Sequence, residues 1–295
     1  MNENVNGPQA GGRPEKEGLF AAEEGRQSPE PGAGASGHSE EVWNEDTYSA
    51  WVRRFGTPEE AAEKLRGNPA IRLRPLDRHF GDVRGKRIMN LMGSNGMKAV
   101  ALALLGAEAS VADFSEGNAA YAERLAEAAD VPLRYYVSDV LKLPPEAAER
   151  AYDIVFAEQG IVHYFTDLRP FMETAFKLLL PGGTFILRDF HPVSTKLIHS
   201  RGSTAKVRKH KVDGDYFDES LEAKTVSYSK YLPGGALGQA EERTVYWRRW
   251  TLGEIVTAAA EAGFRIHLLE EEPNLSSDTF DKGIPKTFTL VAHKP

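Results

Sequence analysis

Apolar runs of strand length alternate with amphipathic helical patterns through the middle of the chain. The apolar runs predict five strands, at residues 87–92, 110–114, 133–138, 153–158 and 184–190. Helical patterns lie between them, at residues 96–106, 116–129, 144–150 and 167–180. Strands separated by helices of this length indicate right-handed crossovers and a parallel sheet with both faces covered. The predicted fold class is therefore α/β, with a Rossmann-like, mostly parallel sheet.

The alternation breaks after the fifth predicted strand. A basic loop is followed by two β-rich runs that are typical of a hairpin inserted beside the sheet, at residues 201–211, 224–232 and 242–250. Thr251 and Glu254 then form a capping box, which starts a helix. Two final strands bring the predicted sheet to seven, at residues 265–270 and 286–292.

Two parts of different composition precede the alternating region. Residues 1–40 are rich in Gly, Pro, Glu and Ser, so burial cannot offset their ordering entropy and we expect a disordered tail. Aromatic residues then recur at helical spacing, at Trp43, Tyr48, Trp51 and Phe55. The next segment starts with a capping box and a proline at the first helical position, formed by Thr57, Pro58 and Glu60. We expect one domain over residues 41–295.

Composition and charge narrow the chemistry. The chain has 295 residues and no cysteine, which excludes disulfides, cysteine-ligated zinc and a catalytic thiolate, and we expect no metal site. Residues 1–45 carry −6 of the formal net charge of −7, so the rest of the chain has no basic face for nucleic acid. No run approaches about 18 apolar residues, and the first residues, "MNENVNGPQAGG", lack the apolar core of a signal peptide, so we expect none. We expect a cytoplasmic protein that does not bind a membrane.

The turn after the first predicted strand, in "NLMGSNGM", matches no phosphate-binding motif. Its glycines form neither G-x-G-x-x-G nor a P-loop with its Lys-Ser/Thr pair. Ligands of open α/β sheets bind beyond the carboxyl ends of the strands. The residues that follow each strand are therefore the candidates for a site.

Five segments at these strand ends occur in an informative order. The first strand runs into Asn90 to Gly96, and the second and third end in "VADFSEGN" and "SDVLKLP". The fourth is "YDIVFAEQGIVHYF", and "LLLPGG" precedes the fifth. Over about residues 41–295 this order resembles the class I S-adenosylmethionine-dependent methyltransferases. The resemblance implies S-adenosylmethionine as the cofactor.

The resemblance also implies which residues contact the cofactor. Asp113 corresponds to the acid that accepts both ribose hydroxyls, and Asp139 with Val140 corresponds to the adenine side. In this family an N-terminal helix commonly closes over the cofactor, which implicates Tyr48 and Trp51. The expected set is Tyr48, Trp51, Asn90, Met92, Gly93, Ser94, Asn95, Gly96, Asp113, Phe114, Ser115, Asp139, Val140 and Glu158.

The first turn departs from the family motif D/E-x-G-x-G-x-G. Asn90 stands where an acid normally meets the ammonium group of the methionine moiety, and it offers a hydrogen bond but no charge. Either cofactor affinity is lower, or another carboxylate compensates. Met92 and Ser94 place side chains where the family has glycines, and Ser94 can donate a hydrogen bond to the cofactor's carboxylate.

Methyl transfer needs in-line alignment of a nucleophile, and it needs a base only where the acceptor must lose a proton. Candidates for catalytic residues follow the fourth and fifth strands: Glu158, His163, Asp189 and His191. Residues 191–250 are expected to form a cap over the substrate, with a wall from Tyr246, Trp247 and Arg248.

The predicted function is methyl transfer to a small-molecule acceptor, with the acceptor and the oligomeric state left open. One alternative is a catalytically inactive protein that binds S-adenosylmethionine or S-adenosylhomocysteine. Another is an NAD-dependent oxidoreductase, because Asp113 lies 20 residues after Gly93, although the missing G-x-G-x-x-G motif argues against it. A nucleic-acid methyltransferase is disfavoured, because the fourth strand ends in "AEQG" rather than N/D-P-P-Y/F and cysteine is absent.

Overall fold

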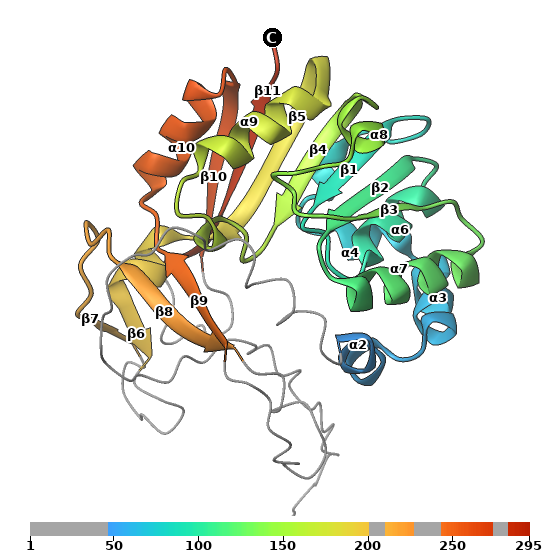
Figure 1. The fold of residues 1–295 in the computed structure, drawn as a ribbon, viewed down its shortest axis with the longest axis horizontal. Helices are drawn as coiled ribbons and strands as arrows, with labels where there is room; N and C mark the ends of the chain where they lie inside the picture. The colour runs from blue at the N-terminus through green and yellow to red at the C-terminus, as the bar shows by residue number, and fades with distance from the viewer. Residues whose placement is uncertain (1–46, 201–209, 227–242, 274–282) are drawn as a thin grey trace, which may run out of the picture. The chain divides into compact units, whose positions relative to one another are not determined.

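The main sheet has seven strands in the order β10-β11-β5-β4-β1-β2-β3 (Figure 1). The structure is a computed structural model that describes residues 47–200, 210–226, 243–273 and 283–295. The strands are β1 (Arg87–Leu91), β2 (Glu108–Asp113), β3 (Arg134–Val137), β4 (Tyr152–Glu158), β5 (Leu179–Phe190), β10 (Arg265–Pro273) and β11 (Pro285–His293). Neighbouring strands are parallel, except that β11 runs antiparallel to both β5 and β10. The mostly parallel seven-stranded sheet predicted from the sequence is confirmed.

Helices cover both faces of this sheet (Figure 1). One face packs against α3, α4, α6 and α7, and Ile88, Phe156 and Ile186 of the sheet belong to this cluster. The other face packs against α9 and α10 through Phe185 and Leu187 of β5. The helices are α2 (Thr47–Phe55), α3 (Pro58–Gly67), α4 (Pro69–Leu73), α5 (Asp77–Phe80), α6 (Met97–Leu104), α7 (Glu116–Ala129), α8 (Pro145–Ala148), α9 (Arg169–Leu178) and α10 (Leu252–Glu261).

Capping residues set the start of two helices as predicted. In α3 the Thr57 side chain accepts from the backbone N–H of Glu60, whose carboxylate accepts from the Thr57 backbone N–H. Thr251 and Glu254 form the same reciprocal pair at the start of α10. Both capping boxes are confirmed, and each satisfies two backbone donors that the helix itself leaves free.

The fifth strand begins earlier than predicted. The helical pattern at 167–180 ends as a helix at Leu178, and β5 already includes Leu179. Pro181 explains the difference, because a proline disfavours the helical conformation in the residue before it and has no N–H to donate. The "LLLPGG" segment therefore opens the strand.

The inserted segment after β5 forms two small antiparallel pairs that are separate from the main sheet. The structure describes β6 (Ile198–Ser200) paired with β7 (His210–Val212), and β8 (Leu221–Val226) paired with β9 (Arg243–Arg248). The predicted hairpin corresponds to β8 and β9, and the segment that joins them lies outside the described residues. So do residues 201–209 of the predicted basic loop, the predicted tail at 1–40, and Trp43.

Candidate functional site

Asp113 ends β2 with both carboxylate oxygens facing hydrogen-bond donors. Its Oδ2 accepts from the backbone N–H of Ser94 at 3.0 Å. Its Oδ1 accepts from the backbone N–H of Ser115 and from the side-chain amide of Asn118, both at 3.0 Å. Burial raises the pKa of Asp113, and these three hydrogen bonds oppose the shift. A carboxylate has about four acceptor positions, so one position on Oδ2 remains for a further donor.

Asn118 connects Asp113 to the N-terminal helix α2. Its side-chain oxygen accepts from the indole N–H of Trp51 at 2.7 Å. Because an indole nitrogen only donates, this contact sets the orientation of the amide and turns its NH₂ group to Asp113. Gly117 allows α2 to approach closely, since a Cβ atom there would lie 3.0 Å from the Cβ of Thr47.

The turn after β1 uses left-handed backbone conformations. Met92 and Ser94 both have φ of 50°, and Gly96 has φ of 69°. The Asn95 side-chain oxygen accepts from the backbone N–H of Met97 at 3.3 Å, at the start of α6. The turn therefore presents the backbone N–H of Ser94 to Asp113 and brings α6 over the end of the sheet.

Gly93 is required in this turn by the side chain of Asn90. A Cβ atom at Gly93 would lie 2.6 Å from the Oδ1 atom of Asn90 and 2.8 Å from a methyl group of Val111. Asn90 is buried, and its amide nitrogen lies 3.4 Å from the backbone oxygens of Leu91 and Phe156. These are long contacts, so the Asn90 amide is only weakly bonded to the protein.

Glu158 ends β4 between two cationic side chains. Its carboxylate contacts the Nζ atom of Lys98 in the first turn of α6, and its Oε1 atom lies 3.4 Å from a guanidinium nitrogen of Arg188 in β5. Only 8% of the Glu158 side chain is exposed. Arg188 also donates to Glu272 of β10 at 2.8 Å. Lys98 and Arg188 are the only charged residues in the runs "MKAVALAL" and "TFILR", a signal that could have identified them from the sequence.

The residues after β3 and the Tyr48 side chain make contacts within the protein that do not involve Asp113. Asp139 accepts from the backbone N–H of Leu141 at 2.9 Å, as a turn residue does. Val140 is buried in the core, and Phe114 is half-buried. Tyr48 packs on helix α7, where it stacks edge to face on Tyr121 and accepts from Arg124 at 3.1 Å. The described contacts do not join Asp139, Val140 or Tyr48 to Asp113.

His163 lies in the 3₁₀ turn η1 (Val162–Tyr164) and in an aromatic cluster with the inserted segment, residues 191–250. Its ring centroid lies 4.2 Å from that of Tyr164 and 4.3 Å from that of Trp247 in β9. The pKa of His163 is lowered to about 4, mainly by burial and also by Arg249, while Asp189 and Glu222 act in the opposite direction. Within the described residues, its buried Nε2 atom has no hydrogen-bond partner.

Asp189 and His191 are both held by the protein. The Asp189 carboxylate accepts from four backbone N–H groups at 2.6–2.9 Å, those of Gly160, Ile161, Val162 and Phe190. The Nδ1 atom of His191 accepts from the backbone N–H of Val193 at 3.1 Å, so its Nε2 atom carries the proton that bonds Glu271 at 2.6 Å. Asp189 therefore stabilises the conformation of the loop after β4. His191 connects the end of β5 to β10 through its hydrogen bond with Glu271.

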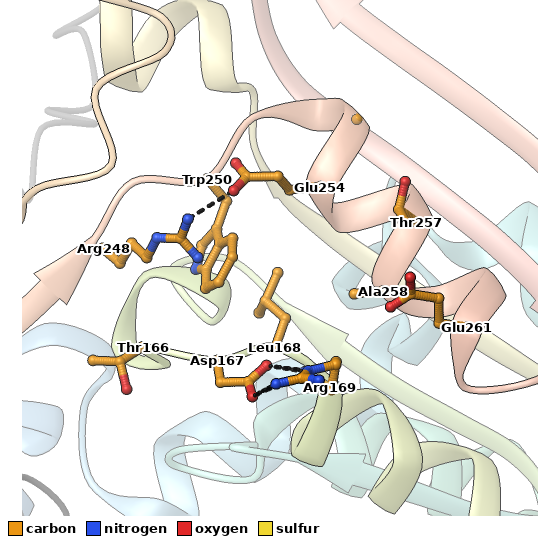
Figure 2. Close-up of a pocket in the computed structure, with 11 residues that line it drawn as sticks. Thr166, Asp167, Leu168, Arg169, Arg248, Trp250, Glu254, Thr257, Ala258 and Glu261 are labelled. Atoms are coloured by element: carbon orange, nitrogen blue, oxygen red, sulfur yellow. Dashed lines mark hydrogen bonds and ion pairs between the residues drawn. The ribbon is translucent and has the colours of Figure 1, made fainter.

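A recess of ≈ 670 Å³ opens beside the cap, between the start of α9 and helix α10 (Figure 2). Arg248 lies in it, stacked over Trp250 at 3.6 Å and paired with Glu254 at 2.7 Å. The recess contains none of the expected cofactor residues. Arg248 and Trp247 are thus on different sides of β9, and only Trp247 reaches His163.

Comparison with known proteins shows what this chain is similar to. Residues 92–187, which run from the turn after β1 to β5, match the family model described as a methyltransferase domain. Over this segment the chain is similar to methyltransferases. It is 34% identical over 110 residues to the demethylmenaquinone methyltransferase of Thermus thermophilus, a match that covers 36% of this chain and 48% of that protein. The chain thus spans about half the length of this curated relative.

Solved structures share the fold of the methyltransferase domain. An S-adenosylmethionine-dependent methyltransferase from Mesorhizobium loti is 21% identical, with a TM-score of 0.54 over 79% of this chain and 99% of that chain. Magnesium protoporphyrin IX methyltransferase from Synechocystis PCC 6803, with bound S-adenosylhomocysteine, is 15% identical, with a TM-score of 0.50 over 87% of this chain and 97% of that chain. The Rossmann-like fold predicted from the sequence is confirmed.

The methyltransferase domain brings part of the expected site together. Asp113, Ser94 and Ser115 meet directly, and Trp51 joins them through Asn118, which the sequence pattern did not point to. None of the helices within the described ranges is long and apolar enough to cross a membrane.

Proposed function

We propose that the protein transfers a methyl group from S-adenosylmethionine to a small-molecule acceptor. The methyltransferase domain match over residues 92–187 carries this proposal, because it includes both the β1 turn and Asp113. The bound cofactor supplies an electrophilic methyl group on a sulfonium centre. The alternatives of an oxidoreductase and of an inactive binder have no comparable support among the relatives and solved structures compared here.

The residues around Asp113 fit a nucleoside. Asp113 is buried yet accepts three N–H donors, which favours its ionised form. The remaining acceptor position on Oδ2 suits a ribose hydroxyl without any change in the protein. A second hydroxyl would replace the Asn118 amide on Oδ1, because both positions of that oxygen are occupied.

The acceptor side of the proposed site is the cluster of His163, Tyr164 and Trp247, where the cap meets η1. A neutral imidazole with an unbonded nitrogen accepts a hydrogen bond from the nucleophilic group of an acceptor. His163 would orient that group by accepting its hydrogen bond while the nucleophile attacks the methyl carbon. Asp189 keeps the loop that carries His163 in place.

A small-molecule acceptor is supported by the relatives. The Thermus thermophilus protein is named for demethylmenaquinone and the Synechocystis protein for magnesium protoporphyrin IX, and both are small molecules. The aromatic cluster around His163 suits an acceptor with a planar ring.

The test of the proposed function is a calorimetric titration with S-adenosylhomocysteine. The wild type should bind it, and Asp113→Ala should bind it at least about tenfold more weakly, as expected for loss of a hydrogen bond to a charged group. Asp82→Asn, which changes an exposed carboxylate paired with Arg84, is the matched control and should bind normally. Tight binding retained by Asp113→Ala would contradict the proposal.

Two further measurements separate the alternatives. A titration with NADH should give no saturable signal, whereas an oxidoreductase would give one. Transfer of label from methyl-labelled S-adenosylmethionine to small molecules of a cell extract distinguishes an enzyme from an inactive binder.

A further inference from the structure

Four alternating charges form a buried cluster at the carboxyl ends of β4, β5 and β10. Lys98 contacts Glu158, Glu158 faces Arg188 at 3.4 Å, and Arg188 donates to Glu272 at 2.8 Å. The exposed fractions of these side chains are 21%, 8%, 10% and 26%, in the same order. Thr287 of β11 also bonds both Arg188 and Glu272, at 3.1 and 3.0 Å.

Such a cluster is weak evidence for a contribution to stability, and it is stronger evidence for a role in binding or catalysis. Taking two charges out of water costs free energy that their mutual attraction often fails to recover, so well-packed apolar residues would serve the fold as well or better. Burial lowers the pKa of Lys98, and Arg72 and Arg188 add repulsion. The contact with the Glu158 carboxylate favours the charged form of Lys98 against these effects.

The strand register places Glu158 opposite Asp113 across the β1 turn. Asn90 pairs with Phe156, so two residues further along each strand Met92 is level with Glu158. Leu91 pairs with Ala112, so Met92 is also level with Asp113. Because adjacent strands lie about 4.8 Å apart, the two carboxylates belong to positions about 10 Å apart, one on each side of the turn.

Side-chain alternation puts these groups on one face of the sheet. Asn90 follows Ile88, Glu158 follows Phe156 and Arg188 follows Ile186, each by two residues, and these apolar residues form the cluster on the α6 side. Val111, two residues before Asp113, packs against Ala99 and Ala103 of α6. A ligand that rests on Asp113 and extends across the turn on this face therefore meets Glu158 and Lys98.

We propose that Glu158 and Lys98 together bind the amino-acid end of the cofactor, with Glu158 receiving its ammonium group and Lys98 its carboxylate. This inference rests on the proposed function. Glu158 is then the carboxylate that replaces the charge missing at Asn90. Arg188 is a positioning residue. It stays bonded to Glu272 and Thr287, and its contact with Glu158 orients that carboxylate.

Charge balance supports a zwitterion rather than a simple anion or cation. Lys98, Glu158, Arg188 and Glu272 sum to zero charge without a ligand, and Arg78, which lies 3.8 Å from Glu272, is half exposed and balanced by Glu270 at 2.6 Å. A bound zwitterion replaces the Lys98–Glu158 ion pair with two ion pairs to the ligand, and the total charge stays at zero. A lone anion or cation would instead leave a net charge in a largely buried place. Lys98 lies in the first turn of α6, where the positive end of the helix dipole also favours a carboxylate.

The test compares two ligands that differ only in the amino-acid end. S-adenosylhomocysteine has it, and 5′-methylthioadenosine has the same thioether nucleoside without it. Calorimetry should show that Lys98→Met and Glu158→Gln each lose about tenfold to a hundredfold in affinity for S-adenosylhomocysteine. Both variants should bind 5′-methylthioadenosine within about twofold of the wild type. Lys142→Met, at an exposed lysine, is the matched control and should change neither affinity.

The two ligands also separate the failure of this inference from that of the proposed function. If the wild type binds neither ligand, the proposed function is wrong and the inference with it. The other outcome is that the wild type binds both ligands. If a variant then loses the same affinity for both ligands, or loses affinity for neither, the cluster does not bind the amino-acid end of the cofactor. Circular dichroism spectra of the two variants check that each is folded, and one folded variant is enough to decide.

Discussion

The indole N–H of Trp51 donates to the side-chain oxygen of Asn118 over 2.7 Å, and the same amide donates to Asp113 over 3.0 Å. A helix near the start of the described chain is thereby connected to the end of β2 through one side chain. The orientation of Asn118 depends on both contacts at once, because the amide has one accepting and one donating end.

Trp51→Phe should lower the free energy of unfolding by about 1–3 kcal/mol, because the buried oxygen of Asn118 loses its donor. Urea unfolding measures the change. The phenyl ring of the variant keeps the stacking on Phe55, where the two ring centroids now lie 5.7 Å apart. Tyr48→Phe is the control in the same helix, because it removes a contact with Arg124 at the exposed surface, and it should cost less. Equal losses in the two variants would contradict the role given to Asn118.

His163 should make the stability of the protein depend on pH below about 6.5. Its pKa is about 4 in the folded protein and about 6.5 in an unfolded chain, so the unfolded state binds more protons between these values. The free energy of unfolding therefore falls as the pH falls from 6.5 to 4, by about 3 kcal/mol in total from this group. Urea unfolding of the wild type and His163→Asn across this range isolates the effect, because other groups titrate in both. Parallel curves would show that His163 is not buried as described.

Gly93→Ala should destabilise the protein by about 1–3 kcal/mol, the usual cost of overpacking. The added methyl would meet Asn90 and Val111 at 2.6 and 2.8 Å. Gly67→Ala is the control, since a Cβ atom there meets nothing within 4 Å, and it should be neutral or stabilising. In the double variant with Asn90→Ala, the loss from Gly93→Ala should shrink, and thermal unfolding of the four proteins measures this coupling.

Asp189→Asn should lower the free energy of unfolding by about 2 kcal/mol or more. The new NH₂ group would face backbone N–H donors that the carboxylate now accepts, and at least one buried donor would lose its partner. Asp167→Asn, at an exposed carboxylate paired with Arg169, should cost much less in the same urea titration. A fully stable Asp189→Asn protein would argue that Asp189 serves catalysis rather than the shape of the loop.

The main elements of the fold were predictable because local signals agree with the final structure. Helix α7 spans residues 116–129 as expected, and Ser115 caps it by accepting from Asn118 at 3.2 Å. Capping boxes and strand-helix alternation act within a few residues, so one sequence is enough to recognise them. The start of β5 was missed because a helical pattern continues up to Pro181.

The site was only partly predictable, since much of it depends on register between distant strands. Asp113 and Trp51 came from a family resemblance, but the amide that joins them is visible only once α2 lies on α7. Lys98 and Arg188 were passed over because their partner, Glu158, is 60 and 30 residues away. The catalytic roles of Glu158, His163, Asp189 and His191 stay predictions.

The indole N–H of Trp250 donates to the backbone oxygens of Val162 and Phe165, at 3.0 and 3.2 Å. Trp250 thus attaches the end of the inserted segment to the loop after β4, which Asp189 also holds through its backbone N–H groups. The inserted segment is therefore held at both of its ends, by His191 through Glu271 and by Trp250. Under the proposed function, residues 192–249 could differ between enzymes with different acceptors while the loop that carries His163 keeps its shape.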